Sequence, residues 1–277
     1  MPIYGVLAII FVAAMMWYTS AEQRYIRAER HLQSGSDPDE ALSLLDASAK
    51  EKYLPAMVMQ ADILLHGKYN QHINPAGAYV LLKEAAELGD GNAWYLKGEC
   101  LENGQGTVRN LTEAHDCYQK AVGAGYVKAK QAEERTAEIA KYWSPALKGE
   151  AEAQYYLGLC YASGNGIKAD DAAAREWFAK SADAGFAPAQ VMLCTMMVEG
   201  KGGPQDTVLG LSYCENAAKQ DYPEAYTKLG EYYYEGKVVA RNYEKAVKYL
   251  AYASQKGSAS AAFKLGFCLQ RLYRCGI

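Results

Sequence analysis

The hydrophobic and polar positions of this chain repeat with the spacing of paired amphipathic helices. One sequence motif recurs along the chain. A small residue precedes an apolar helix face that ends in Leu-Gly, a Tyr or Leu follows three residues later, and a glycine-containing break leads to a second helix that ends in paired small residues. The clearest copies lie at residues 153–186 and 225–257. The pattern predicts a tandem helix–turn–helix repeat.

The glycine of the Leu-Gly pair marks the period of this repeat. Successive intervals between these positions are 37, 60, 36, 36 and 36 residues. The long interval is one period of 36 plus 24 residues, which is room for one extra helix. Residues 127–142, rich in Ala, Glu and Lys and free of Gly and Pro, are expected to form it. The marked positions are Ala61, Gly98, Gly158, Cys194, Gly230 and Gly266.

A small residue at this position lets two helices approach closely, so a bulky residue of the second helix should fill the space between them. The expected fillers lie nineteen or twenty residues further on and are Leu81, Cys117, Trp177, Tyr213 and Tyr249. Residues 21–33 and 39–50 resemble a weaker first pair, and residues 259–274 a lone first helix that closes the array. The sequence thus predicts about thirteen helices that share one continuous core.

This repeated motif resembles the repeat of the Sel-one-like repeat (SLR) family, an α-solenoid relative of the tetratricopeptide repeat. Residues 153–186 match the family pattern best, followed by 93–125 and 225–257, and the resemblance covers roughly residues 38–275. It implies an all-α, α–α superhelix and a role as an adaptor, assembly factor or accessory subunit. The fourth good copy departs from the pattern, with Cys194 in place of Gly and Gly210 in place of Ala.

The N-terminal segment, residues 2–21, carries no charge over twenty residues. A helix of that length spans about 30 Å, the thickness of a bilayer core, and this predicts a transmembrane helix ahead of a repeat region at 22–277. A secretory signal peptide cleaved near Ser20 is the alternative, although no Lys or Arg precedes the apolar stretch. Arg24, Arg27 and Arg30 favour a cytoplasmic repeat region, whereas the SLR resemblance favours the periplasmic side.

Amino-acid composition argues against several classes of partner and of chemistry. The net charge of −3, from 29 basic and 32 acidic residues, comes without a basic cluster, which argues against nucleic acid as a partner. Four His and seven Cys show neither zinc-ligand spacing nor a nucleophile–base pair. We therefore expect no catalytic residue, metal, cofactor or small-molecule substrate. The Gly-x-Gly breaks are interpreted as helix caps rather than phosphate loops.

Two cysteine pairs, Cys100 with Cys117 and Cys194 with Cys214, each lie on the two helices of one repeat. Both pairs fit buried packing, and both also fit disulfides if the protein is exported. The sequence leaves the two interpretations open.

The tyrosine-rich first helices suggest a binding surface. If the repeats stack as tetratricopeptide units do, the residues three before and one after the marked glycine face the concave side. They would form an aromatic and acidic trough for a partner segment with basic and apolar side chains. The alternative is a solvated helix face with Tyr at contacts between repeats. The candidate binding residues at these two positions are Tyr95, Glu99, Tyr155, Glu231 and Phe263, and Glu102 and Tyr234 lie nearby on the same faces.

These features predict a membrane-anchored, non-catalytic scaffold or adaptor that binds a membrane-associated protein, as an accessory subunit or assembly factor of a membrane complex. An exported, periplasmic SLR binding protein, such as an immunity or host-interaction factor, is the alternative.

Overall fold

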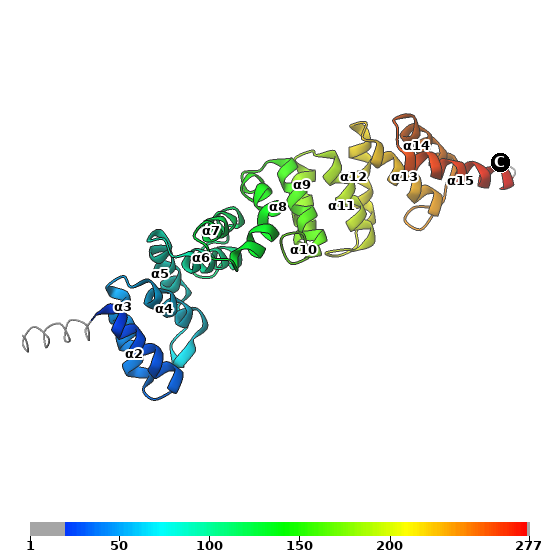
Figure 1. Cartoon of the computed structure of the whole chain (residues 1–277). Coiled ribbons are helices and arrows are strands. Elements are labelled where there is room, and N and C mark those ends of the chain that lie inside the picture. Colours follow the sequence, from blue (N-terminus) through cyan, green and yellow to red (C-terminus); the bar gives the residue numbers. More distant parts are fainter. Residues whose placement is uncertain (1–19, 276–277) are drawn as a thin grey trace, which may run out of the picture. The chain divides into compact units, whose positions relative to one another are not determined.

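The computed structural model describes residues 20–275, in which all the regular secondary structure is helical and no strand occurs (Figure 1). The chain forms two compact units, residues 1–136 and 137–277, and the boundary between them falls within α8. The fourteen α-helices and one 3₁₀ turn of the described range are α2 (Ala21–Ser34), α3 (Pro38–Lys50), α4 (Leu54–His66), η1 (Lys68–Asn70), α5 (Pro75–Glu87), α6 (Gly91–Asn103), α7 (Leu111–Gly123), α8 (Ala129–Leu147), α9 (Ala151–Ser163), α10 (Asp171–Asp183), α11 (Ala187–Glu199), α12 (Thr207–Lys219), α13 (Pro223–Glu235), α14 (Tyr243–Gln255) and α15 (Ala259–Cys275).

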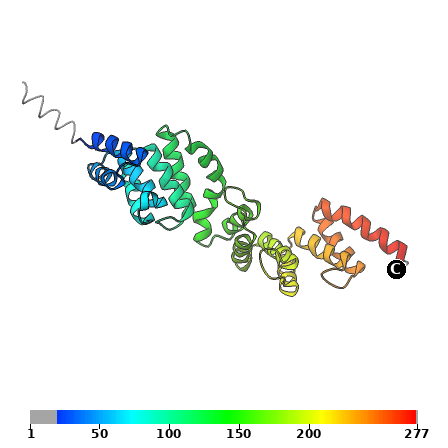
Figure 2. The same cartoon turned by 90° about the horizontal axis from the view of Figure 1, so that it is seen from below.

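Consecutive helices pack in pairs within each unit (Figures 1 and 2). The first unit holds the pairs α2–α3, α4–α5 and α6–α7, and the second holds α9–α10, α11–α12 and α13–α14, followed by α15. The helical repeat predicted from the sequence is therefore present, with one more helix than expected. The extra helix of the long interval is α8, which extends five residues beyond the predicted end at 142.

Polar caps define where these helices begin and end. The side chain of Asn110 accepts a hydrogen bond from the backbone N–H of Glu113 at the start of α7, and Asp170 caps α10 in the same way. Gly164 ends α9 with a φ of 77°, a left-handed conformation that Gly adopts without steric cost. Gly104 and Gly200 end α6 and α11 likewise, so the Gly-x-Gly breaks serve as helix caps.

A large side chain of each second helix presses on the marked glycine of the first. A Cβ added at Gly158 would lie 2.7 Å from Cε1 of Phe178, a side chain with no exposed surface. Only glycine therefore allows this close approach of α9 and α10. The same contact joins Gly98 to Tyr118 and Gly230 to Leu250.

The filler residues predicted from spacing are wrong by one position. Trp177, the predicted filler over Gly158, is half-buried, and Nζ of Lys180 lies 4.0 Å from its ring centroid. Successive helical side chains point about 100° apart, so one residue more or less in the preceding break decides which of two neighbours faces inward. Tyr213 and Tyr249 are half-buried as well, as is Leu81, which lies beside the fully buried Leu82. Cys117 is buried, but the side chain on Gly98 is its neighbour Tyr118.

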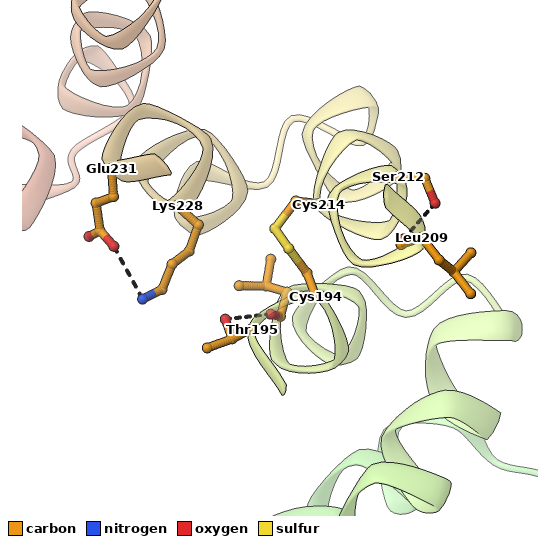
Figure 3. The surroundings of a disulfide bond; sticks show 8 residues. Cys194, Thr195, Leu209, Ser212, Cys214, Lys228 and Glu231 are labelled. Carbon is orange, nitrogen blue, oxygen red and sulfur yellow. Dashed lines mark hydrogen bonds and ion pairs between the residues drawn. A yellow bond between two sulfur atoms is a disulfide. The ribbon is translucent and has the colours of Figure 1, made fainter. Parts of the chain in front are cut away.

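A disulfide replaces the glycine contact in the 187–222 repeat. Cys194 of α11 stands at the glycine position and Cys214 of α12 at the position of the large residue, and their sulfur atoms are bonded (Figure 3). Both side chains are fully buried, so the bond lies inside the apolar core of the second unit. The other predicted pair does not form, because Cys100 and Cys117 are both free and buried.

Repeated hydrogen bonds hold the helices in register. Oγ of Ser181 donates to the carbonyl of Ala151 at the start of α9 (2.6 Å), and Nε2 of Gln190 donates to the carbonyl of Ala182 at the end of α10 (3.2 Å). The first bond ties the two helices of a pair together, and the second ties a pair to the next one. Buried bonds of this kind fix the helix stacking because their loss would leave unpaired polar groups.

The predicted anchor lies almost entirely outside the described residues, which begin at Ser20. Oγ of Ser20 caps α2 by accepting a hydrogen bond from the N–H of Gln23, so the last residues of the predicted segment belong to the first helical pair. None of the helices between residues 20 and 275 is long and apolar enough to cross a membrane.

Candidate functional site

In the first unit, the candidate residues Tyr95 and Glu99 of α6 contact one another. The Tyr95 hydroxyl donates to Oε1 of Glu99 (2.8 Å), and the Tyr95 ring lies 5.7 Å from that of Tyr118 and 5.4 Å from that of Tyr126. Burial, and then the hydrogen bond to Glu99, raise the pKa of Tyr95 to about 12. Tyr95 is thus a neutral, half-buried donor at neutral pH.

Glu102, the third candidate of α6, belongs to an internal network. Its carboxylate accepts a hydrogen bond from the buried Tyr118 hydroxyl (2.7 Å) and pairs with both terminal nitrogens of Arg135 on α8. Burial acts to raise the pKa of Glu102, but the bonds from Arg135 and Tyr118 outweigh it and the net pKa is lowered. Glu102 therefore holds α8 against α6 and α7 within the first unit, which is a structural role.

In the second unit, Tyr155 of α9 lies among other aromatic rings. Its ring centroid is 5.3 Å from that of Tyr156, 5.8 Å from that of Phe178 and 5.4 Å from that of Phe186. The side chain is half-buried. Tyr155 therefore contributes to the packing of its own repeat and exposes only part of its surface.

The remaining candidates lie at the end of the second unit. Glu231 and Tyr234 line a pocket of about 330 Å³ together with Lys264 and Phe267 of α15. Glu231 is paired with Lys264 and with Lys228, whose Nζ lies 3.2 Å from its Oε2 (Figure 3 shows the pair with Lys228). The pocket thus holds balanced charges rather than an unpaired acid.

Phe263 of α15 lies beside this pocket and does not line it. Its ring meets that of Phe267 edge-on at 4.9 Å between centroids, and 69% of its surface is exposed. The structure therefore brings Glu231, Tyr234 and, through Phe267, Phe263 into one region of the second unit.

A second pocket matches the predicted aromatic and acidic character better, and the sequence analysis did not identify it. Tyr142 of α8 and Tyr156 of α9 stack with centroids 4.7 Å apart and an interplanar angle of 19°. Together with the exposed Glu150 and Glu152 at the start of α9, they line a pocket of about 400 Å³. Lys141 also lines it, and its Nζ lies 3.0 Å from Oε2 of Glu138. The spacing rule could not find it because Tyr142 lies on the extra helix, outside the repeat period.

The described side chains offer little for covalent or metal chemistry. Burial raises the pKa of Cys100, Cys117, Cys160 and Cys268 to about 11, so these thiols are protonated at neutral pH. Within residues 20–275 there is no group of three or more His, Cys, Asp or Glu side chains placed to hold a metal ion.

Comparison with known proteins identifies the class. The Sel1 repeat matches residues 55–90, 94–126, 151–186, 187–222 and 223–258, which together make up more than half of the chain. Helical pairs α4–α5, α6–α7, α9–α10, α11–α12 and α13–α14 correspond to these five copies. The chain belongs to the Sel1 repeat family, whose all-α repeats form scaffolds for protein–protein interaction.

Two curated relatives share part of this region. DAP3-binding cell death enhancer 1 of Rattus norvegicus is 26% identical over 183 residues, which cover 48% of this chain and 36% of that protein. An uncharacterized protein of Neisseria meningitidis serogroup B is 31% identical over 106 residues, covering 38% of this chain and 22% of that protein. The chain thus matches only about a third or less of the length of these relatives.

Two bacterial proteins of known structure align with most of the chain at low TM-scores. A protective antigen of uropathogenic Escherichia coli with an SLR fold aligns at a TM-score of 0.48 and 23% identity, covering 94% of this chain and 58% of that chain. An immunity protein of Pseudomonas aeruginosa aligns at a TM-score of 0.28 and 24% identity, covering 76% and 67%.

Proposed function

We propose that this protein is a membrane-anchored, non-catalytic scaffold whose repeats bind a membrane-associated protein partner. The five Sel1 repeats support the interaction role. The uncharged apolar segment at residues 2–21 supports the anchor, because its length suits a bilayer core. An accessory subunit or assembly factor of a membrane complex needs both properties.

The partner segment we propose carries a Lys or Arg side chain next to apolar residues. The observation that carries this proposal is the stacked pair of Tyr142 and Tyr156, bordered by the carboxylates of Glu150 and Glu152. Tyrosine rings attract a cation over their faces, and nearby carboxylates add to that attraction. By contrast, Glu102 already binds a cation of its own unit.

The location we propose for the repeats is the oxidising side of the membrane. Disulfides persist in periplasmic and extracellular proteins and are rare in the reducing cytosol, and Cys194 and Cys214 form one. Two of the three arginines that favour the opposite topology also have a structural role, because Arg24 pairs with Glu51 at the end of α3 and Arg27 with Glu40 of α3 (2.9 Å). The same disulfide favours the second candidate, an exported binding protein released by cleavage near Ser20.

Affinity purification of the tagged full-length chain from detergent-solubilised membranes tests the proposed binding surface. We expect one stoichiometric membrane protein to co-purify, and Tyr156→Ala or Glu152→Gln to reduce its recovery. Glu244→Gln, an exposed acid on the second helix α14, is the matched control and should leave recovery unchanged. Equal loss with all three variants, or with none, would contradict the proposed pocket.

Carbonate extraction and N-terminal sequencing test the anchor separately. We expect the full-length chain to stay in the membrane pellet. Release of the chain by carbonate, or a mature N-terminus close to Ser20, would instead assign the exported form.

A further inference from the structure

An apolar groove lies between the second helices α10 and α12 of the second unit. Its floor contains Leu193 and Met197 of α11, of which 2% and 7% of the surface is exposed. Leu209 of α12 lines one side, keeps 44% of its surface exposed and points away from the disulfide (Figure 3). The groove has a volume of about 360 Å³. Pockets that bind ligands have volumes of about 300–1,000 Å³, so this groove is large enough to receive a side chain of a partner.

The corresponding positions of the first unit are occupied by larger and charged side chains. Helices α5, α6 and α7 start at residues 75, 91 and 111, each 96 residues before the starts of α10, α11 and α12 at 171, 187 and 207. An ion pair between Lys97 and Glu113 (3.3 Å) takes the place of the two leucines of the groove. The ring of Tyr79, at the position of Arg175, packs against the buried cluster of that unit.

The corresponding positions at the end of the second unit are occupied as well. Helices α13 and α14 start at 223 and 243, each 36 residues after α11 and α12. Tyr233 stands at the position of Met197, and its ring stacks on that of Tyr249 with centroids 5.8 Å apart. Nζ of Lys245, at the position of Leu209, lies 5.0 Å from the centroid of the Tyr233 ring. In both copies, therefore, an aromatic ring and a lysine side chain stand where the groove between α10 and α12 is lined by smaller apolar side chains.

Arg175 of α10 lines the groove and keeps most of its hydrogen-bond donors unused. A Cβ added at Gly203 would lie 2.9 Å from its Nη1, so the guanidinium group lies against this part of the break. Nη1 donates one long hydrogen bond, of 3.4 Å, to the carbonyl of Lys201. Among the described residues no carboxylate pairs with this guanidinium group, because Asp171 pairs with Nζ of Lys201 instead (3.2 Å). A guanidinium group offers five N–H donors in a geometry that matches a carboxylate.

We infer that this groove binds a protein segment in which an aromatic residue stands next to an acidic one. The aromatic ring fills the apolar space over Met197, as a ring does at the equivalent Tyr233. The acidic side chain pairs with the guanidinium group of Arg175. This site adds a second surface to the proposed scaffold role, and its occupant carries the opposite charge to that of the Tyr142–Tyr156 pocket.

Methyl NMR of the full-length protein in detergent micelles tests this docking, because Met197 on the groove floor is a reporter for ¹³C-labelled methionine methyl groups. The probe is an acetylated and amidated peptide of sequence Gly-Ser-Glu-Phe-Glu-Gly-Ser. We expect a saturable shift of the Met197 signal, which is assigned by its loss in Met197→Leu. Arg175→Gln should weaken binding at least about tenfold, and a peptide with Gln in place of both Glu should bind as weakly to the wild type. Leu209→Ala, which shortens the apolar side of the groove without a change of charge, should also weaken binding.

Arg30→Gln is the matched control, because Arg30 is an exposed arginine of α2, and it should leave binding unchanged. Glu176 also lines the groove, so Glu176→Gln should leave binding unchanged or strengthen it. Absence of a saturable Met197 shift, equal loss with Arg175→Gln and Arg30→Gln, or loss with Glu176→Gln would overturn the inference. Binding only of a peptide that ends in Phe with a free carboxylate would overturn it too, since it would assign the groove to a chain terminus. Tyr156→Ala should leave the Met197 shift intact, so failure of the proposed pocket and failure of this groove give different results.

Discussion

Two adjacent residues of α10, Phe178 and Trp177, provide the sharpest test of how the repeats pack. Phe178 has no exposed surface, lies on Gly158 and contacts the ring of Tyr155. Phe178→Ala removes this side chain from a fully packed site, and α9 cannot move closer to fill the gap without disturbing its other contacts. Such substitutions cost about 3–5 kcal/mol of unfolding free energy.

Trp177→Ala, the substitution favoured by sequence spacing, should cost much less. Its half-buried ring is covered on one side by the Lys180 ammonium group, an interaction worth about 0.5–1 kcal/mol near the surface. With the loss of partial burial, we expect a total of about 1–2 kcal/mol. The larger residue should therefore matter less than its smaller neighbour.

Thermal unfolding followed by far-UV circular dichroism measures both variants without relying on tryptophan fluorescence. At about 2–4 °C per kcal/mol, thermal midpoints should fall by roughly 6–20 °C for Phe178→Ala and by roughly 2–8 °C for Trp177→Ala. A Trp177→Ala midpoint as low as that of Phe178→Ala would refute the assignment of Phe178 as the residue on Gly158.

Three further predictions concern the glycine, disulfide and carboxylate contacts. In thermal melts, Gly266→Ala should stabilise the chain by up to about 1 kcal/mol, because alanine has the higher helix propensity. Gly158→Ala should show no such gain or a loss, because the added methyl group overpacks the helix contact at a cost of about 1–3 kcal/mol. Reduction of the Cys194–Cys214 bond opens the loop that the disulfide closes in the unfolded chain and should lower the free energy of unfolding by about 3 kcal/mol. A variant with serine at both positions should not respond to reductant. Folding lowers the pKa of Glu102, so its ionised carboxylate stabilises the folded chain above the unfolded pKa of about 4.3, and this stabilisation is lost as the pH falls through the folded pKa. The unfolding midpoints of Glu102→Gln and wild type should therefore differ at pH 7 and converge in acid.

The sequence alone determined the class of fold and its period. Helical periodicity, capping residues and glycine breaks are local signals, and their recurrence every 36 residues identifies paired helices without knowledge of any long-range contact. The extra helix α8 and the lone helix α15 followed from the same arithmetic, because each occupies a length of chain that the period leaves over.

Tertiary structure decided which side chains meet. Spacing selected Trp177 rather than Phe178, because the rotational phase of a second helix depends on the path of the break before it. The partner of Glu102 lies 33 residues away on a helix outside the repeat, so no spacing rule could pair it with Arg135. Gly158 and Gly266 are indistinguishable in the sequence pattern, yet one is covered and the other open, since coverage depends on a neighbouring helix and not on the residue itself.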